Sequence, residues 1–260
     1  HDECIKNRSD FEKYRNVVRK LTEKNVKLCG KFLGENKLKK RGKKVIYDAH
    51  EDLPRQFMGN SKVPGRKIIS WAVEFLEDYI AARLDGIITA TPYIAQRFKR
   101  VHANTIDVNN FPLASEIEFL DQQAKPKDPY VCYIGGIWPS RGIAELVDAM
   151  ELSDVSLALA GKIEPDYRTL LSQSKGWSKV QELGFIDRQT SMQLKQQAIA
   201  GVVTFLPFPN HINAQPNKIF EYMAAGLPVI GSNFPLWKEL IEGNECGLCV
   251  DPTQPSEIAA

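Results

Sequence analysis

The sequence predicts an α/β protein with two parallel sheets, because short apolar runs alternate with amphipathic stretches along most of its length. The apolar runs stop abruptly at glycine or charged residues, which is typical of buried parallel strands. A polar stretch over residues 113–129, which contains Pro126 and Pro129, interrupts the alternation and predicts an interdomain connection. We therefore expect two α/β domains, residues 1–122 and residues 123–260.

In the first domain, hydrophobic periodicity predicts one helix over 10–22 and a longer one over 66–83. The longer helix is expected to turn its apolar side chains toward the core. These side chains are Ile68, Ile69, Ala72, Phe75, Leu76, Tyr79 and Ile80. A further helix begins at Thr91-Pro92, and strands are predicted at 26–29, 45–47, 86–90 and 105–109. The assignment of residues 1–42 to this domain stays open.

In the second domain the alternation is more regular. Strands are predicted at 130–134, 155–160, 179–183, 201–206, 228–230 and 247–250. Helices are predicted between them at 141–150, 165–173, 188–198, 217–225 and 235–242. This alternation predicts a parallel α/β sheet, and open sheets of this kind bind ligands at the carboxyl ends of their strands.

Composition is that of a globular protein: hydrophobic residues make up 43% and charged residues 25% of the 260 positions. No apolar run is long enough to cross a membrane and no secretory signal is visible, so a cytoplasmic protein is expected. Residues 1–50 contain 15 Lys and Arg against 7 Asp and Glu. Such a basic segment can contact an anionic membrane surface, or it can simply be a solvated face. We expect no nucleic-acid partner.

Cysteine usage argues against a disulfide framework, because the five cysteines are odd in number and irregularly spaced. Cys246 and Cys249 form a lone C-x-x-C. It is either half of a redox or zinc site, or two small residues around a turn that leads into a strand. The second interpretation is favoured because no further Cys or His pair lies nearby in the sequence.

A loop, a helix and a buried strand are predicted over residues 213–230. A helix that begins near Pro216 or Asn217 offers free backbone N–H groups and a partial positive charge to a phosphate. Lys218 adds a cation to the first turn, and Glu221 can accept hydrogen bonds from a ribose one turn later. The alternative is an ordinary helix with a surface glutamate.

A second stretch, residues 133–142, runs from a strand into Gly135 and Gly136, where the backbone can approach a ligand closely. Arg141 follows at the start of the next helix, and its guanidinium is suited to a diphosphate. Neither stretch is a dinucleotide fingerprint or a P-loop. Both are expected at the carboxyl edge of one sheet.

Together, Gly135-Gly136, Arg141-Gly142, Gly161, Gly184-Phe185-Ile186 and residues 216–230 resemble the retaining glycosyltransferase family 4, whose fold is GT-B. The similarity is to bacterial members that build surface polysaccharides. It covers about residues 43–260, and implies a GT-B fold of two Rossmann-like domains that face each other, with the N-terminal one incomplete. It also implies transfer of a sugar from a nucleoside-diphosphate donor to a glycan or lipid-linked acceptor, with retention and without a metal or other cofactor.

The resemblance implies roles for single residues. Glu221 matches the second Glu of the family's E-x7-E motif and would bind the donor ribose, while Asn213 replaces the first Glu. Arg141 matches a cation that binds the diphosphate, and Gly136 replaces a frequent Arg. The resemblance also implies that Pro216, Asn217 and Lys218 place helix-end amides by the phosphate. Ile186 would lie near the base.

His50 matches a family histidine that faces the transferred sugar, although it can equally be a packing histidine. His211 can line the sugar pocket or be an ordinary loop residue. The acids Asp48, Glu51 and Asp52 are expected to be solvated or supporting groups rather than metal ligands. Two other functions stay open: a non-catalytic nucleotide-sugar-binding or assembly subunit, and a GT-B sugar-nucleotide 2-epimerase.

Overall fold

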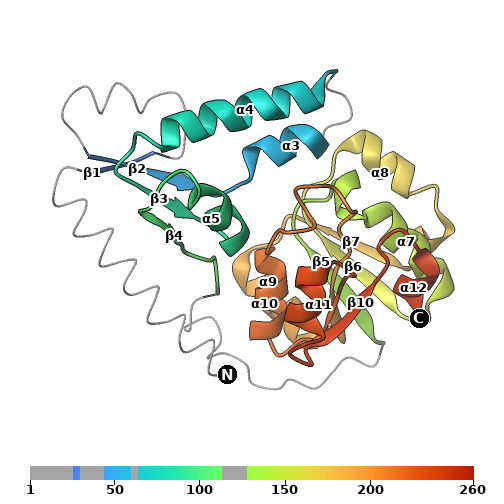
Figure 1. The fold of residues 1–260 in the computed structure, drawn as a ribbon. Coiled ribbons are helices and arrows are strands. Elements are labelled where there is room, and N and C mark those ends of the chain that lie inside the picture. Colours follow the sequence, from blue (N-terminus) through green and yellow to red (C-terminus); the bar gives the residue numbers. More distant parts are fainter. Residues whose placement is uncertain (1–25, 30–43, 60–63, 113–127) are drawn as a thin grey trace. The chain divides into compact units, whose positions relative to one another are not determined.

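The computed structural model describes residues 26–29, 44–59, 64–112 and 128–260, which form two compact units, 1–110 and 111–260 (Figure 1). Unit 1 and unit 2 below denote these two ranges. The helix predicted over 10–22 and nearly all of the connection predicted over 113–129 lie outside the described residues. Each unit has its own parallel sheet and its own buried core.

Unit 1 is built on a four-stranded parallel sheet in the order β1-β2-β3-β4. Its strands are β1 (Val26–Cys29), β2 (Lys44–Ala49), β3 (Gly86–Thr89) and β4 (Thr105–Asp107). The helices are α3 (Leu53–Gly59) and α4 (Arg66–Ala81), between β2 and β3, and α5 (Pro92–Phe98), between β3 and β4. The side chain of Thr91 caps α5 by accepting a hydrogen bond from the Ile94 N–H at 3.3 Å.

The expected orientation of α4 is wrong for most of its apolar residues. Ile69 is half-buried and Ile80 is buried, but Ile68, Ala72, Phe75, Leu76 and Tyr79 are exposed. The face turned into unit 1 instead carries Ser70, Glu77 and Ala81. Hydrophobic periodicity identifies an apolar face but does not say on which side the core lies.

Acidic side chains of α4 face inward because unit 1 supplies their partners. The buried carboxylate of Glu77 accepts a hydrogen bond from the Tyr47 hydroxyl at 2.7 Å and pairs with Arg97. Arg97 also lies 3.6 Å from Asp78 and 3.4 Å from Asp52. Burial raises the pKa of Glu77, Asp78 and Asp52, while the charge of Arg97 opposes the rise.

Unit 2 has a six-stranded parallel sheet in the order β10-β9-β8-β5-β6-β7. Its strands are β5 (Tyr130–Ile134), β6 (Ser156–Ala160), β7 (Val180–Gly184), β8 (Ala200–Val203), β9 (Val229–Ser232) and β10 (Gly247–Val250). The chain builds β5, β6 and β7 outward, then returns to the other side of β5 for β8, β9 and β10. This is the doubly wound order, and its switch point lies between β5 and β8.

Helices and short 3-10 turns connect these strands. They are η1 (Pro139–Arg141), α7 (Ile143–Leu152), α8 (Pro165–Leu171), η2 (Lys175–Lys179), α9 (Arg188–Gln197), α10 (Asn217–Ala224), α11 (Pro235–Ile241) and α12 (Pro255–Ala259). The strand predicted over 201–206 ends early, because beyond Val203 the chain leaves the sheet and Leu206 donates its N–H to the Ser140 carbonyl at 3.1 Å. No helix among the described residues is long and apolar enough to cross a membrane.

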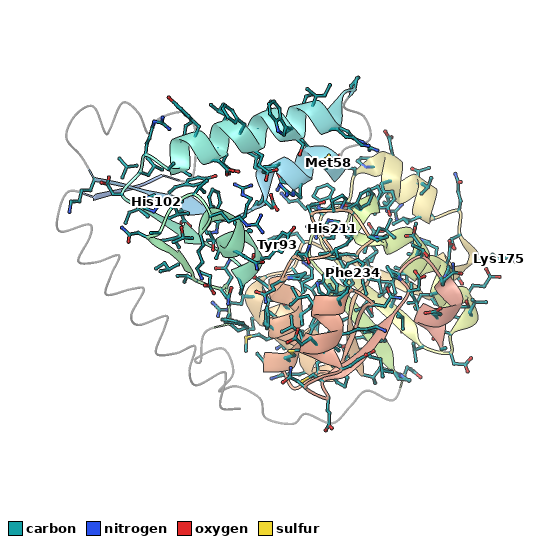
Figure 2. The ribbon with its side chains drawn as sticks, viewed as in Figure 1. Met58, Tyr93, His102, Lys175, His211 and Phe234 are labelled. Carbon is teal, nitrogen blue, oxygen red and sulfur yellow. The ribbon has the colours of Figure 1, made fainter. Side chains whose placement is uncertain are left out.

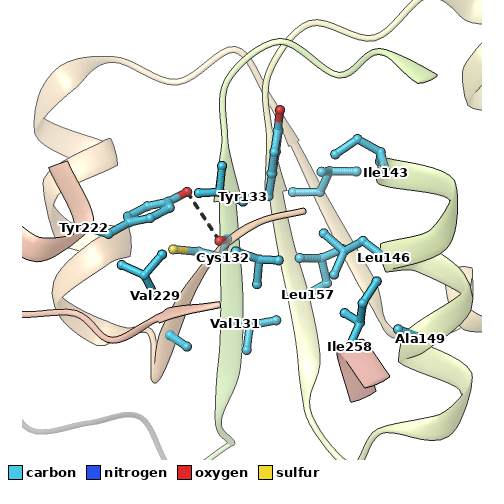
Figure 3. Close-up of a cluster of buried hydrophobic side chains, with 14 of the residues drawn as sticks. Val131, Cys132, Tyr133, Ile143, Leu146, Ala149, Leu157, Tyr222, Val229 and Ile258 are labelled. Atoms are coloured by element: carbon cyan, nitrogen blue, oxygen red, sulfur yellow. Dashed lines mark hydrogen bonds between the residues drawn. The ribbon is translucent and has the colours of Figure 1, made fainter. Parts of the chain in front are cut away.

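The core of unit 2 holds the two halves of the sheet and α10 together. Tyr222 of α10 is fully buried beside β5, and its hydroxyl donates to the Cys132 carbonyl at 3.4 Å (Figure 3). The hydroxyl oxygen of Tyr222 also accepts a hydrogen bond from the Ile134 N–H at 3.1 Å. Leu146 and Ile143 of α7 cover the other side of β5 (Figure 3). These contacts fix α10 against the strand after which the candidate site begins.

Candidate anion and nucleotide site

Two loops of unit 2 form the candidate site at the switch point. One loop, residues 135–142, follows β5, and the other, residues 204–216, follows β8 and leads into α10. The Leu206–Ser140 hydrogen bond joins the loops. Because β5 and β8 are adjacent and parallel, both loops emerge at the same edge of the sheet, where doubly wound folds bind ligands.

Gly135 leaves the space that Lys218 occupies. Its backbone has φ +141°, and a Cβ on it would lie 2.2 Å from the Lys218 ammonium nitrogen. That nitrogen lies 5.6 Å from the centre of the Tyr133 ring, whose hydroxyl donates to the Gly136 carbonyl at 2.8 Å. The structure therefore places Lys218 directly beside Gly135, at the end of β5.

Arg141 is held on the same loop. Its guanidinium carbon lies 4.0 Å from the centre of the Phe205 ring, a cation–π contact to the second loop. Gly142 follows in the left-handed conformation, φ +69°, where a Cβ would lie 1.9 Å from the Thr204 carbonyl oxygen. Only glycine permits this close approach of the two loops.

Arg141 and Lys218, the cation pair, make this edge of the sheet positive. Burial lowers the pKa of Lys218, the charge of Arg141 lowers it further, and Glu221 opposes both. None of the ion pairs found among the described residues includes Lys218. A partly buried ammonium beside a guanidinium is unfavourable by itself and becomes favourable when an anion binds to both.

Residues 204–216 are anchored from several sides. Trp237 donates its indole N–H to the Ala214 carbonyl at 2.8 Å, and Ser232 donates to the Phe205 carbonyl at 2.8 Å. Asn213 is half-buried between these anchors. His211 is buried (Figure 2), with its Nδ1 2.9 Å from the Leu206 carbonyl oxygen. Burial lowers the pKa of His211, and its ring contacts make it a packing residue of the loop.

The start of α10 has the expected form. Pro216 is the N-cap and Asn217 the first helical residue, and no side chain caps the helix. Lys218 and Glu221 are three residues apart on it, and therefore neighbours on its surface. Glu221 also lines a pocket of about 270 Å³ between α9 and α10. The pocket is lined further by Pro112, Arg188, Ser191, Met192, Lys195, Gln196, Ala224 and Ala225.

Lys195 and Arg188 were not anticipated from the sequence. Lys195 Nζ lies 3.8 Å from the Glu221 carboxylate, and both lysine and glutamate line the pocket. Arg188, Met192 and Lys195 are spaced by four and three residues on α9, which places them on one face. That spacing is the signal that could have identified them, once α9 was known to run beside α10.

The remaining predicted site residues lie elsewhere. Ile186 is half-buried just after β7, at the carboxyl edge of the same sheet, and it does not line the pocket. His50 belongs to unit 1, where it follows β2 with an exposed ring and its Nε2 lies 2.9 Å from the Asp48 carboxylate. The predicted roles of these residues stay predictions.

Residue types that bind metals or carry redox chemistry are dispersed in the described part of the chain. No group of three or more His, Cys, Asp or Glu side chains gathers there in a way that could hold a metal ion. Cys246 and Cys249 are both free thiols, the first before β10 and the second within it. Burial raises the pKa of Cys249 to about 11, so its reactive thiolate is disfavoured at neutral pH.

Several solved structures have a similar architecture. Sucrose-phosphate synthase from Thermosynechococcus elongatus superposes with a TM-score of 0.67 at 20% identity, over 90% of this chain and 62% of that one. A glycosyltransferase from Rickettsia africae matches with a TM-score of 0.59 at 14% identity, over 90% and 85%. S. aureus TarM, in complex with fondaparinux, alpha-GlcNAc-glycerol and UDP, matches with 0.58 at 16%, over 83% and 42%.

These matches define the class: an α/β protein with parallel sheets that shares the GT-B glycosyltransferase fold. The chain spans about three fifths of the synthase and less than half of TarM. No curated protein matches the sequence. Residues 115–260 match the family described as glycosyl transferases group 1, and the chain belongs to that family. The expectation of a GT-B glycosyltransferase is thereby confirmed.

Proposed function

We propose that this protein transfers a hexosyl group from a nucleoside-diphosphate sugar to a hydroxyl group of a glycan or lipid-linked acceptor. The observation that carries the proposal is the cation pair, Arg141 and Lys218, at the switch point of unit 2. A diphosphate is the anion that such a pair suits, since it presents several oxygens to two adjacent cations. Family membership supports the sugar-transfer chemistry.

In the proposed reaction, the bond between the anomeric carbon and the diphosphate oxygen breaks and a bond to the acceptor oxygen forms. The diphosphate departs with the electron pair of the broken bond and gains negative charge, and the proton of the acceptor hydroxyl passes to a departing phosphate oxygen or to solvent. Arg141, Lys218 and the backbone N–H groups that follow the N-cap Pro216, beginning with that of Asn217, would stabilise that charge, which is electrostatic catalysis by preorganised groups. The proposal includes no metal or other cofactor.

The nucleoside would lie on the α10 side of the cation pair. Glu221 is placed to accept hydrogen bonds from the ribose, since it is electrostatically coupled to Lys218 and lines the neighbouring pocket. Ile186 would contact the base. Asn213 and His50 would hydrogen-bond hydroxyls of the transferred sugar, because an amide and an imidazole can each donate and accept.

Retention of the anomeric configuration, and a place in polysaccharide biosynthesis, complete the proposal and rest on the resemblance to family 4. Contact with a membrane surface belongs to the same proposal, because a lipid-linked acceptor would lie there. The complex of TarM with UDP and alpha-GlcNAc-glycerol supports nucleoside-diphosphate chemistry on this fold.

Calorimetry with UDP, GDP, ADP and CDP tests the donor site. We expect one nucleotide to bind selectively and Arg141→Ala and Glu221→Ala to lose about tenfold or more in affinity, as is typical of charged hydrogen bonds. Arg168→Ala and Glu151→Ala remove members of exposed ion pairs in the same unit and serve as controls. If no nucleotide binds, or all four variants lose affinity equally, the proposed donor site is wrong.

A measurement of turnover distinguishes an enzyme from a non-catalytic binding subunit. Asn213, which stands in place of a glutamate, favours the non-catalytic alternative. The protein is incubated with the sugar derivative of the nucleotide that binds and with a mixture of glycan and lipid-linked acceptors, and the products are analysed by NMR. A product with the donor's anomeric configuration supports retaining transfer. Selective nucleotide binding without turnover on any acceptor would favour the non-catalytic role.

A further inference from the structure

An exposed row of large apolar side chains runs along α4 of unit 1. Ile68, Trp71, Phe75 and Tyr79 repeat at spacings of three and four residues, and Leu76 lies beside them. Their exposed fractions are 74%, 68%, 63%, 49% and, for Leu76, 46%. We call these five residues the apolar stripe. Contiguous exposed apolar surface of this kind usually marks an interaction site.

The stripe is ordered rather than loose. The rings of Trp71 and Phe75 stack with their centres 6.0 Å apart. The guanidinium of Arg83 lies 3.4 Å from the centre of the Tyr79 ring, which fixes a cation at the C-terminal end of the stripe.

The charges around the stripe are all of one sign. Arg66 and Lys67 are exposed at its N-terminal end, and Arg83 is exposed at the other. No acidic residue is exposed among residues 66–83. The acids of α4 are each beside an arginine: the half-buried Glu74 lies 2.5 Å from Arg55, and the buried Glu77 and half-buried Asp78 are engaged by Arg97. The exposed side chains of residues 66–83 therefore combine large apolar groups with cations, while every acid is paired with an arginine.

This combination fits an anionic lipid surface. Aromatic residues favour the boundary between headgroups and acyl chains, and cations beside them attract anionic headgroups. A helix of 16 residues is about 24 Å long, which suffices to lie along the interface without crossing it. We propose that α4 is a membrane-docking helix, with the apolar stripe inserted and Arg66, Lys67 and Arg83 on the headgroups. This proposal rests on the membrane contact included in the proposed function and assigns it to α4, and the donor site of unit 2 has no part in it.

Vesicle flotation of the full chain, without nucleotide, tests the proposal. We expect the protein to float with vesicles of phosphatidylcholine and phosphatidylglycerol, and more weakly with phosphatidylcholine alone. Trp71→Gln/Phe75→Gln should lower the partition coefficient about tenfold or more, because two large apolar side chains no longer insert. Arg66→Glu/Lys67→Glu should remove the preference for phosphatidylglycerol.

Leu170→Gln/Leu248→Gln is the matched control, because it replaces two exposed apolar side chains of unit 2, 54% and 68% exposed. This control should float like the parent protein. Circular dichroism and nucleotide calorimetry check that the α4 variants fold and that the donor site is unaffected. The proposal is overturned if the parent protein does not float, or if Trp71→Gln/Phe75→Gln floats as well as the parent. Light scattering that shows a dimer lost in this variant, without flotation, would assign the stripe to a second copy instead.

Discussion

The two units bury charge in opposite ways. Unit 1 surrounds the guanidinium of Arg97 with three carboxylates, those of Glu77, Asp78 and Asp52, so each buried charge has a partner. Unit 2 keeps Lys218 half-buried beside Arg141, and none of the ion pairs found in the described residues includes this lysine. Charges that satisfy one another indicate structure, whereas like charges held together indicate a site for an external ligand.

The largest effect is expected from Arg97→Met. It leaves the buried Glu77 and its neighbours without their cation, which should cost about 3–5 kcal/mol of the free energy of unfolding of unit 1. Lys218→Met is the matched change in unit 2. Because it removes a desolvated cation with no ion-pair partner among the described residues, it should change stability by less than about 1 kcal/mol.

Hydrogen exchange followed by mass spectrometry measures the two units separately. Peptides from β2 and β3 should lose protection in Arg97→Met, while peptides from β5 and β8 keep theirs. Nucleotide affinity should fall in Lys218→Met and stay unchanged in Arg97→Met. If both variants destabilise their units equally, Lys218 has a structural partner and the contrast between the units does not hold.

A second effect, on ligand affinity, is expected from Gly135→Ala. The new Cβ would occupy the position of the Lys218 ammonium, 2.2 Å away, and displace it from the site. The loss of one charge-assisted contact should weaken nucleoside-diphosphate binding by about 1.5–3 kcal/mol in calorimetry. Gly226→Ala is the control: it has φ +63° and no atom within 4 Å of the added Cβ. Equal affinity in both variants would show that Lys218 does not contact the ligand.

Sequence patterns predicted the sheets well because apolar runs and glycines are local signals. The strand predicted over 247–250 is observed as Gly247–Val250, and the two parallel sheets predicted from strand–helix alternation are observed. The failures are tertiary. The inward face of α4 depends on Arg97 and Arg55, which come from other helices, and Lys195 meets Glu221 only because α9 and α10 are neighbours. The strand predicted over 201–206 is too long at its end because Phe205 is apolar, although this side chain is buried in the loop after β8.

Nucleotide affinity should also depend on pH through Lys218. Burial and Arg141 lower the pKa of this group below its ordinary value of 10.5, so it loses its proton at a lower pH than a surface lysine does. Because a bound diphosphate favours the protonated form, affinity should fall as pH rises through the lowered pKa. Calorimetry across the alkaline range measures this fall. It should disappear in Lys218→Met, and its persistence there would assign it to another group.

The smallest effect concerns acid stability, where the units should differ in sign. Burial lowers the pKa of His211, so the unfolded chain takes up a proton more readily and unit 2 should lose stability as pH falls below 6.5. In unit 1, burial raises the pKa of Glu77 above 4.5, so the folded form binds the proton more tightly than the unfolded chain does. Protonation of Glu77 in acid should therefore remove part of the free-energy cost of burying its charge. Urea unfolding of the parent protein and His211→Gln at several pH values, read by hydrogen exchange in each unit, measures both slopes. An unchanged slope for unit 2 in His211→Gln would show that another group carries its acid sensitivity.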